Sequence, residues 1–167
     1  MMGNRKILAF AAGTSALAFA AVQFAPALAT PGSGFAPSPI VTGQFDPFHT
    51  ISHKDARWPS WDLLFRTKAP TDMGVDQLTV QVGGYSGWHT HAGPIYVTVK
   101  AGSVTWYDAA CGARTFHAGD TYIEPSHSVH FVRNEGSEIA TLVAVAPRPR
   151  GAPGRIDAPE PECAKQD

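Results

Sequence analysis

A succession of short runs rich in Val, Ile, Thr and aromatic residues begins at Gln77 and continues to Pro147. Gly, Pro, Asn or Asp bounds each run, and these residues favour turns. No stretch after residue 70 shows a helical period. Evenly spaced short strands separated by turns predict an all-β sandwich or barrel. The runs are QLTVQVGG, GPIYVTVKAG, SVTWYDA, DTYIEP, SVHFVRNEG and EIATLVAVAP.

The segments on either side of this region differ from it in composition. Residues 30–47 are rich in Pro, Gly, Ser and Ala, which indicates an extended arm. Residues 48–69 contain RWPSWDLLFRTKA, which fits either a covering strand or a short helix. Residues 148–167 have too little apolar content to pack on their own. We therefore expect one barrel domain over residues 48–147, preceded by the arm and followed by a Pro-rich tail.

The first 29 residues have the pattern of a secretory signal peptide. Arg5 and Lys6 precede an Ala-rich apolar run that closes on Ala27-Leu28-Ala29, with small residues where a signal peptidase cleaves. A retained N-terminal anchor is the alternative, although polar residues interrupt the run. We expect residues 1–29 to be removed and the mature chain to be secreted or periplasmic, without membrane contact after cleavage.

The charge of the mature chain argues against a nucleic-acid partner. From Thr30 onward there are 11 basic and 14 acidic residues, a net charge of −3 with His neutral. The only basic run is RPRGAPGR near the end. No second apolar segment is long enough to cross a membrane. A small molecule is therefore the expected partner.

Two cysteines, Cys111 and Cys163, remain in the mature chain. An even count in an exported protein favours a disulfide, and the alternative is two free thiols. A bridge between them would close a loop of about fifty residues and stabilise the fold by about 2–4 kcal/mol. It would also tie the Pro-rich tail to the barrel.

Histidines within the strand-like runs indicate a metal site. His89 and His91 are two residues apart on an expected strand, so both imidazoles face the same side. A divalent transition metal needs several ligands that converge from different directions. A strand distant in sequence must supply the rest, and it carries His130. A chance placement of these histidines on a solvated strand face is the alternative.

The spacing of these residues resembles the two consensus motifs of the cupin superfamily. The resemblance covers residues 83–134 and implies a cupin-type antiparallel β-barrel, also called a double-stranded β-helix or jelly roll. The glycines at the motif ends would let the chain turn sharply between strands. Gly83, His89, His91 and Gly102 match the first motif, and Gly119, Pro125, His130 and Asn134 match the second.

The resemblance implies a divalent transition metal, which is Fe, Mn, Zn, Ni or Cu, held by His89, His91 and His130. The acidic ligand of the first motif falls on Ile95, so this chain departs from the family there. Glu124 and His127 are the candidates to fill the gap or to move a proton. For Glu124 we favour a surface carboxylate. His127 replaces a usual glycine and fits either the mouth of the site or an exposed turn.

An apolar lining is expected beside the metal, from Ile95, Val97 and Val99, with Phe131 or Val132 depending on register. Trp88 should face away from the metal, under the arm or a second subunit.

Three functions remain open. The first is a metal-dependent oxidoreductase of dioxygenase type. The second is a non-catalytic barrel that binds a metal or a small molecule, and the third is a structural domain with a vestigial site. Exposed strand edges also make a homodimer reasonable.

Overall fold

The computed structural model describes residues 30–52 and 56–166, so the predicted signal peptide at 1–29 lies outside the described residues. Within these ranges the chain is built from antiparallel strands, and the only helix is a short 3₁₀ helix, η1. The elements are β1 Ser33–Phe45, β2 His49–Ser52, β3 Leu63–Arg66, β4 Thr71–Tyr85, β5 His89–Thr90, β6 Ile95–Ala101, β7 Ser103–Asp108, β8 Ala113–His117, β9 Thr121–Glu124, β10 His130–Arg133, β11 Ala140–Pro149, β12 Ile156–Asp157 and η1 Glu162–Gln166.

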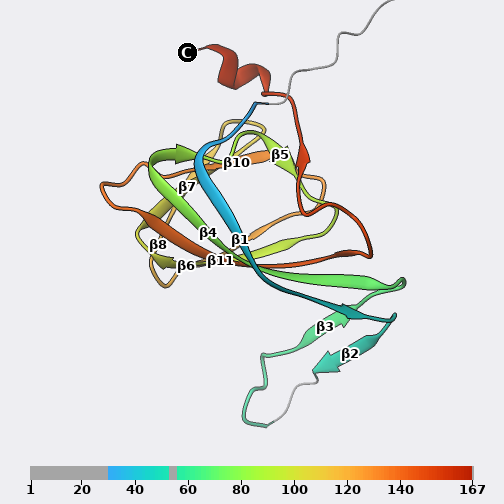
Figure 1. Cartoon of the computed structure of the whole chain (residues 1–167). Helices are drawn as coiled ribbons and strands as arrows, with labels where there is room; N and C mark the ends of the chain where they lie inside the picture. Colours follow the sequence, from blue (N-terminus) through green and yellow to red (C-terminus); the bar gives the residue numbers. More distant parts are fainter. Residues whose placement is uncertain (1–29, 53–55, 167) are drawn as a thin grey trace, which may run out of the picture.

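Ten strands form one sheet that curls into a nearly closed antiparallel barrel, which confirms the predicted all-β fold class (Figure 1). One wall of the barrel runs β1-β4-β11-β6-β9, and the other contains β12-β5-β10-β7-β8. The walls are joined where β10 pairs with β4, at Arg133 opposite Tyr85. Strands from distant parts of the chain therefore face one another across the interior.

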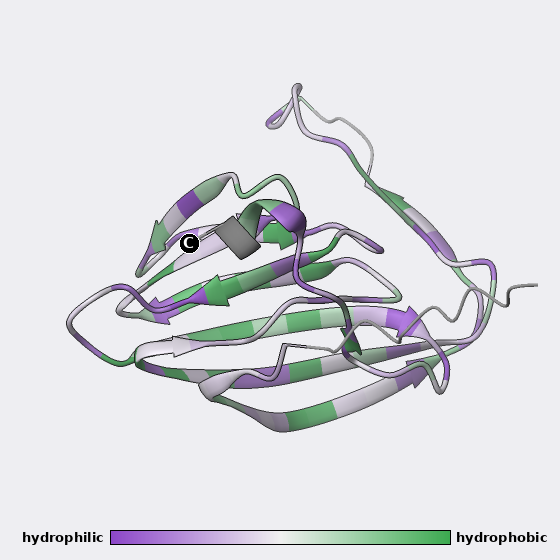
Figure 2. Cartoon of the chain, turned by 90° about the horizontal axis from the view of Figure 1, so that it is seen from above, coloured by the Kyte–Doolittle hydropathy of each residue, from purple (hydrophilic) through white to green (hydrophobic). Residues whose placement is uncertain are grey.

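Alternation of apolar and polar residues decides which face of each strand is buried. In β6, Ile95, Val97 and Val99 are buried, whereas the residues between them are exposed. Figure 2 shows this alternation along the barrel strands. β11 contributes Leu142 and small alanines to the same interior. These alanines leave room inside the barrel, because no bulky side chain extends from that strand there.

Of the three motif glycines, Gly102 and Gly119 lie in turns between strands, whereas Gly83 lies near the end of β4. Gly83, Gly102 and Gly119 all have positive φ values, of 73°, 72° and 95°, a conformation that favours glycine. Asn134 is fully buried, and its side-chain amide donates to the carbonyl oxygens of Val80 and Glu138. The last residue of the second motif therefore has a structural part in holding the β10–β11 connection.

The segment expected to be an extended arm pairs with the sheet. β1 runs antiparallel to β4 from Phe35 opposite Val80 to Phe45 opposite Thr71. Its two prolines cannot donate to a ladder, and an edge strand tolerates them because one side of it has no partner. Phe35 packs against the core and so brings the arm to the interior.

The segment 48–69, for which the pattern allowed a strand or a helix, contains the two strands β2 and β3 in its described part. β2 and β3 make a separate two-stranded sheet that projects from one end of the barrel (Figure 1). Phe45, Phe48 and Phe65 pack edge to face at its base. Trp61 and Leu64 on the hairpin are exposed.

The C-terminal tail lies against the barrel, as predicted for a disulfide-tied segment. Cys163 is bonded to Cys111 in the turn between β7 and β8, across a sequence separation of 52 residues. β12 pairs with β5, and the amide of Ala158 donates to the carbonyl of Trp88. The boundaries of arm, barrel and tail stay predictions. No helix in the part of the chain that the structure covers is long and apolar enough to span a membrane.

Candidate metal centre

The three predicted histidines meet at one end of the barrel interior. β5 carries His89, and His91 follows directly after the end of this strand. β10 places His130 directly opposite His89. All three side chains are buried, and His130 is fully so. The ring centroids are 4.5 Å apart for His89 and His130, and 5.2 Å apart for His91 and His130. Two distant strands thus supply the converging ligands that a single strand cannot.

Backbone carbonyl groups fix the orientation of each ring. Nδ1 of His89, His91 and His130 lies 2.8, 2.6 and 2.8 Å from a carbonyl oxygen. A carbonyl oxygen only accepts, so Nδ1 carries the proton and donates, and Nε2 keeps its lone pair. The acceptors are Gly87, Gly154 and Ser128 respectively. Hydrogen bonds from Nδ1 to a carbonyl oxygen also orient metal-binding histidines in other proteins.

Glu124 completes the cluster, and the expectation that it is a surface carboxylate is wrong. It is 5 % exposed, and its Oε2 lies 3.3 Å from Nε2 of His91 and 3.4 Å from Nε2 of His130. β9 alternates, so Tyr122 and Glu124 both point inward. Ile95 is the cross-strand partner of Glu124. The carboxylate absent from β6 is therefore present on the neighbouring strand.

Burial and mutual contacts shift the pKa values of two residues of the cluster. Burial and the nearby His130 and Arg155 lower the pKa of His89 to about 3. Burial alone would raise the pKa of Glu124, but its contacts with His130 and His91 outweigh this and lower the pKa to about 2. At neutral pH His89 is therefore uncharged and Glu124 is ionised.

The four side chains fit a metal ion. One ligand atom from each of His89, His91, Glu124 and His130 lies within 4.8 Å of the others. Nε2 of His91 and of His130 is buried and accepts no hydrogen bond from the described part of the chain. With Nδ1 protonated, each of these lone pairs faces the Glu124 carboxylate, an arrangement that a cation stabilises. The donor set, imidazole with carboxylate, suits first-row transition metals.

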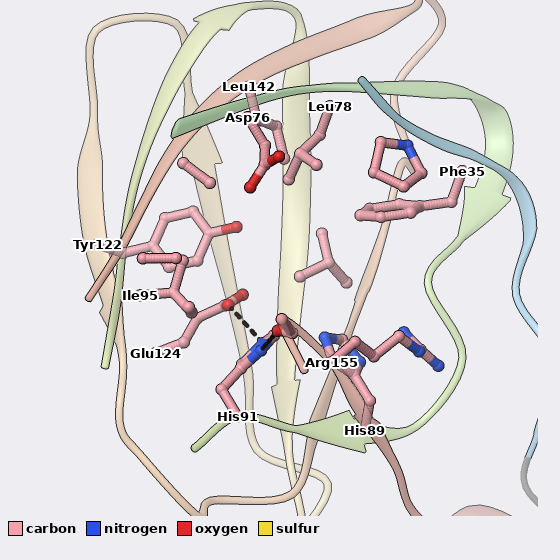
Figure 3. Close-up of a pocket in the computed structure, with 15 residues that line it drawn as sticks. Phe35, Asp76, Leu78, His89, His91, Ile95, Tyr122, Glu124, Leu142 and Arg155 are labelled. Atoms are coloured by element: carbon pink, nitrogen blue, oxygen red, sulfur yellow. Dashed lines mark hydrogen bonds and ion pairs between the residues drawn. The ribbon is translucent and has the colours of Figure 1, made fainter. Parts of the chain in front are cut away.

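An apolar cavity of about 240 Å³ adjoins the cluster. Ile95 lines it as expected, and Val132 rather than Phe131 faces it. Phe131 turns outward and packs against Trp88 and Tyr107. Figure 3 shows His91 and Glu124 on one side of the cavity, with Phe35 and Leu78 among the apolar walls.

Three polar residues that the sequence analysis missed also line the cavity: Asp76, Tyr122 and Arg155. Burial and the Glu124 charge raise the pKa of Tyr122 well above its ordinary value. The Tyr122 hydroxyl is buried without a hydrogen-bond partner among the described residues. A buried polar group without a partner lowers the stability of a fold by about 1–3 kcal/mol. Its position two residues before Glu124 on a strand is the signal that could have found it.

His127 is not brought into the cluster. It is exposed on the turn between β9 and β10, with a φ of 60°, and does not line the cavity. Its backbone amide donates to the carbonyl of His91 over 2.9 Å. The left-handed conformation explains why a glycine is usual at this motif position. Trp88 faces away from the cluster, and its amide donates to Oγ1 of Thr30 in the arm.

A model of a known protein family matches part of the chain. Residues 77–146 match the family model described as Cupin domain. Among curated proteins, none matches the sequence.

Solved structures that resemble the chain do so at low identity. A cupin-like protein from Thermotoga maritima is 18 % identical, with 53 % of this chain and 65 % of that chain covered and a TM-score of 0.48. A conserved protein with a double-stranded β-helix domain from Klebsiella pneumoniae is 21 % identical, with coverages of 68 % and 84 % and a TM-score of 0.46. The polyketide cyclase RemF from Streptomyces resistomycificus is 17 % identical, with coverages of 57 % and 68 % and a TM-score of 0.46. The chain spans just under two thirds of the length of the Thermotoga protein.

Proposed function

We propose that this chain, whose residues 77–146 match the family model described as Cupin domain, is an exported cupin that binds a divalent transition metal and acts as a metal-dependent oxidoreductase. His89, His91, Glu124 and His130 are the proposed ligands. One observation carries this proposal: Nε2 atoms with free lone pairs converge with an ionised carboxylate, and backbone carbonyls fix every ring in that orientation.

The residues around such a metal would have different roles. A redox metal held by these four residues would supply electron transfer and Lewis acidity. Glu124 balances part of the metal charge, and the three imidazoles stay neutral. The apolar walls around Leu78 and Leu142 exclude water from the reacting molecule.

Export rests on two independent features. The Cys111–Cys163 disulfide is compatible with an oxidising compartment. The pattern of residues 1–29, outside the described residues, is that of a secretory signal. The expected homodimer stays a prediction, which sedimentation of the purified protein would test.

A non-catalytic binding barrel is the second candidate, and the apolar cavity favours it. The volume of the cavity and its mostly hydrophobic lining suit a small ligand, whether or not that ligand is turned over. Oxygen consumption by the metal-loaded protein with candidate ligands separates the two. Metal and ligand bound without turnover would favour this candidate.

Metal content tests the proposal directly. The full chain is purified without a nickel column or chelator, and its metals are measured by mass spectrometry. We expect near-stoichiometric metal in the wild type and a large loss in His130→Ala and Glu124→Gln. His117→Ala removes an exposed histidine outside the cluster and should retain the metal. A wild type that stays empty after reconstitution with Fe, Mn, Zn, Ni and Cu would overturn the metal centre.

A further inference from the structure

Tyr122 has a tightly packed ring and a hydroxyl group without a hydrogen-bond partner among the described residues. The ring is 7 % exposed and stacks on Phe116, with centroids 4.3 Å apart and an interplanar angle of 19°. The hydroxyl group points into the cavity (Figure 3). No protein group in the described ranges hydrogen-bonds to it. A phenylalanine would pack here equally well, so packing alone does not account for the oxygen atom.

The other residues that line the cavity restrict the polarity and charge of a ligand that could bind beside the Tyr122 hydroxyl. Most lining residues are aliphatic or aromatic, so the body of a ligand must be apolar. Asp76 lies on the wall, and its carboxylate disfavours an anionic group beside it. Nε of Arg155, which is also on the wall, pairs with Asp157 over 2.6 Å, and this pair offsets part of the arginine charge. The lining therefore favours an uncharged ligand.

The volume limits the ligand further. An apolar cavity of about 150 Å³ holds benzene, and this cavity measures about 240 Å³. A molecule of one ring with a few substituents fits, whereas drug-sized ligands need about 300 Å³ or more.

We propose that the cavity binds an uncharged, largely apolar molecule of one-ring size that carries a carbonyl oxygen, and that the Tyr122 hydroxyl donates a hydrogen bond to this oxygen. Tyr122 is thus a specificity-determining residue of the site. This inference rests on the proposed function for the place of the ligand, beside the metal cluster. It adds the class of ligand and the residue that selects it.

Two probes of nearly equal shape test the inference: acetophenone, which has a carbonyl group, and α-methylstyrene, which has a methylene group instead. Binding of each is followed by NMR titration of the full chain, using the methyl signals of the cavity residues Leu142 and Ala144. Tyr122→Phe removes only the hydroxyl. Tyr107→Phe is the matched control, because the Tyr107 hydroxyl donates to Glu135 outside the cavity.

The wild type should prefer acetophenone. Tyr122→Phe should weaken acetophenone binding by about fivefold to tenfold and leave α-methylstyrene binding unchanged, with Tyr107→Phe like the wild type. Equal binding of both probes by wild type and Tyr122→Phe would overturn the inference, and so would an absence of shifts at Leu142 and Ala144. A rise in the unfolding temperature of Tyr122→Phe, with the loss of acetophenone preference, would show a role in binding rather than in folding.

The titrations are repeated on metal-free and metal-loaded protein, so that the two proposals fail separately. Discrimination by Tyr122 in a protein that takes up no metal on reconstitution would overturn the metal centre alone. Bound metal without discrimination would overturn the ligand assignment alone.

Discussion

Ile95 on β6 and Glu124 on β9 are directly opposite residues of an antiparallel pair, and both side chains are buried on the inner face. The carboxylate that the first motif lacks therefore lies one strand away from its usual position. Opposite residues of such a pair have Cβ atoms about 5 Å apart, a distance that a glutamate side chain can span. The cluster keeps three imidazoles and one carboxylate, although the motif has lost its acidic residue.

Exchanging these two residues tests whether the position of the carboxylate matters. Glu124→Gln should lower the affinity for a divalent metal by about 100-fold or more, since a direct ligand should exceed the 10–100-fold that a supporting residue contributes. The double variant Ile95→Glu/Glu124→Ile should recover most of this loss, because the carboxylate still faces the cluster. Calorimetric metal titration measures both. A double variant no better than Glu124→Gln would show that only β9 can present the carboxylate.

The buried cluster predicts a pH-dependent stability for the metal-free protein. The pKa of His89 falls from 6.5 to about 3 on folding, so the unfolded chain binds more protons between these values. Stability should therefore rise with pH from about 3 to 6.5. The pKa of Glu124 falls from 4.5 to about 2 on folding. Between these two pH values, Glu124 therefore also makes the stability rise with pH.

Urea unfolding of the metal-free chain at several pH values measures this slope. His89→Gln should flatten it between pH 4.5 and 6.5, where Glu124 contributes little. Parallel pH profiles for the two proteins would contradict the assignment of the slope to His89.

The disulfide should stabilise the fold and the tail together. Cys111→Ser/Cys163→Ser should lower the free energy of unfolding by about 2–4 kcal/mol, because the bridge closes a long loop in the unfolded chain. It should also weaken metal binding, since the tail supplies the Gly154 carbonyl that orients His91. Denaturant unfolding and metal titration measure the two effects. A reducing agent should reproduce both in the wild type and change nothing in the double variant.

The turn at His127 carries strain that a glycine would relieve. A left-handed conformation costs a residue with a side chain about 1–2 kcal/mol, against up to about 1 kcal/mol of extra entropy for glycine in the unfolded chain. His127→Gly should therefore stabilise the protein by up to about 1 kcal/mol and leave the metal content unchanged. His127→Val, with a branched side chain at this φ, should destabilise it. A loss of metal in His127→Gly would instead place this histidine in the functional site.

The sequence by itself determined the barrel and the histidine set. Alternation along single strands is a local property, so it fixed the inward faces of Ile95, Val97 and Val99 and paired His89 with His91. Motif spacing then connected His130 to them. Both kinds of signal can be read from the chain because they depend on short separations or on regular spacing.

Only the tertiary structure decided which residues meet across strands. The strand register places Glu124 opposite Ile95 and turns Val132, rather than Phe131, toward the cavity. It also brings the Gly154 carbonyl to His91 over a separation of 63 residues, and the Tyr122 hydroxyl into the apolar interior. The physical reason is that register between distant strands is set by the packing of the whole barrel, and a shift by one residue would reverse every inward face.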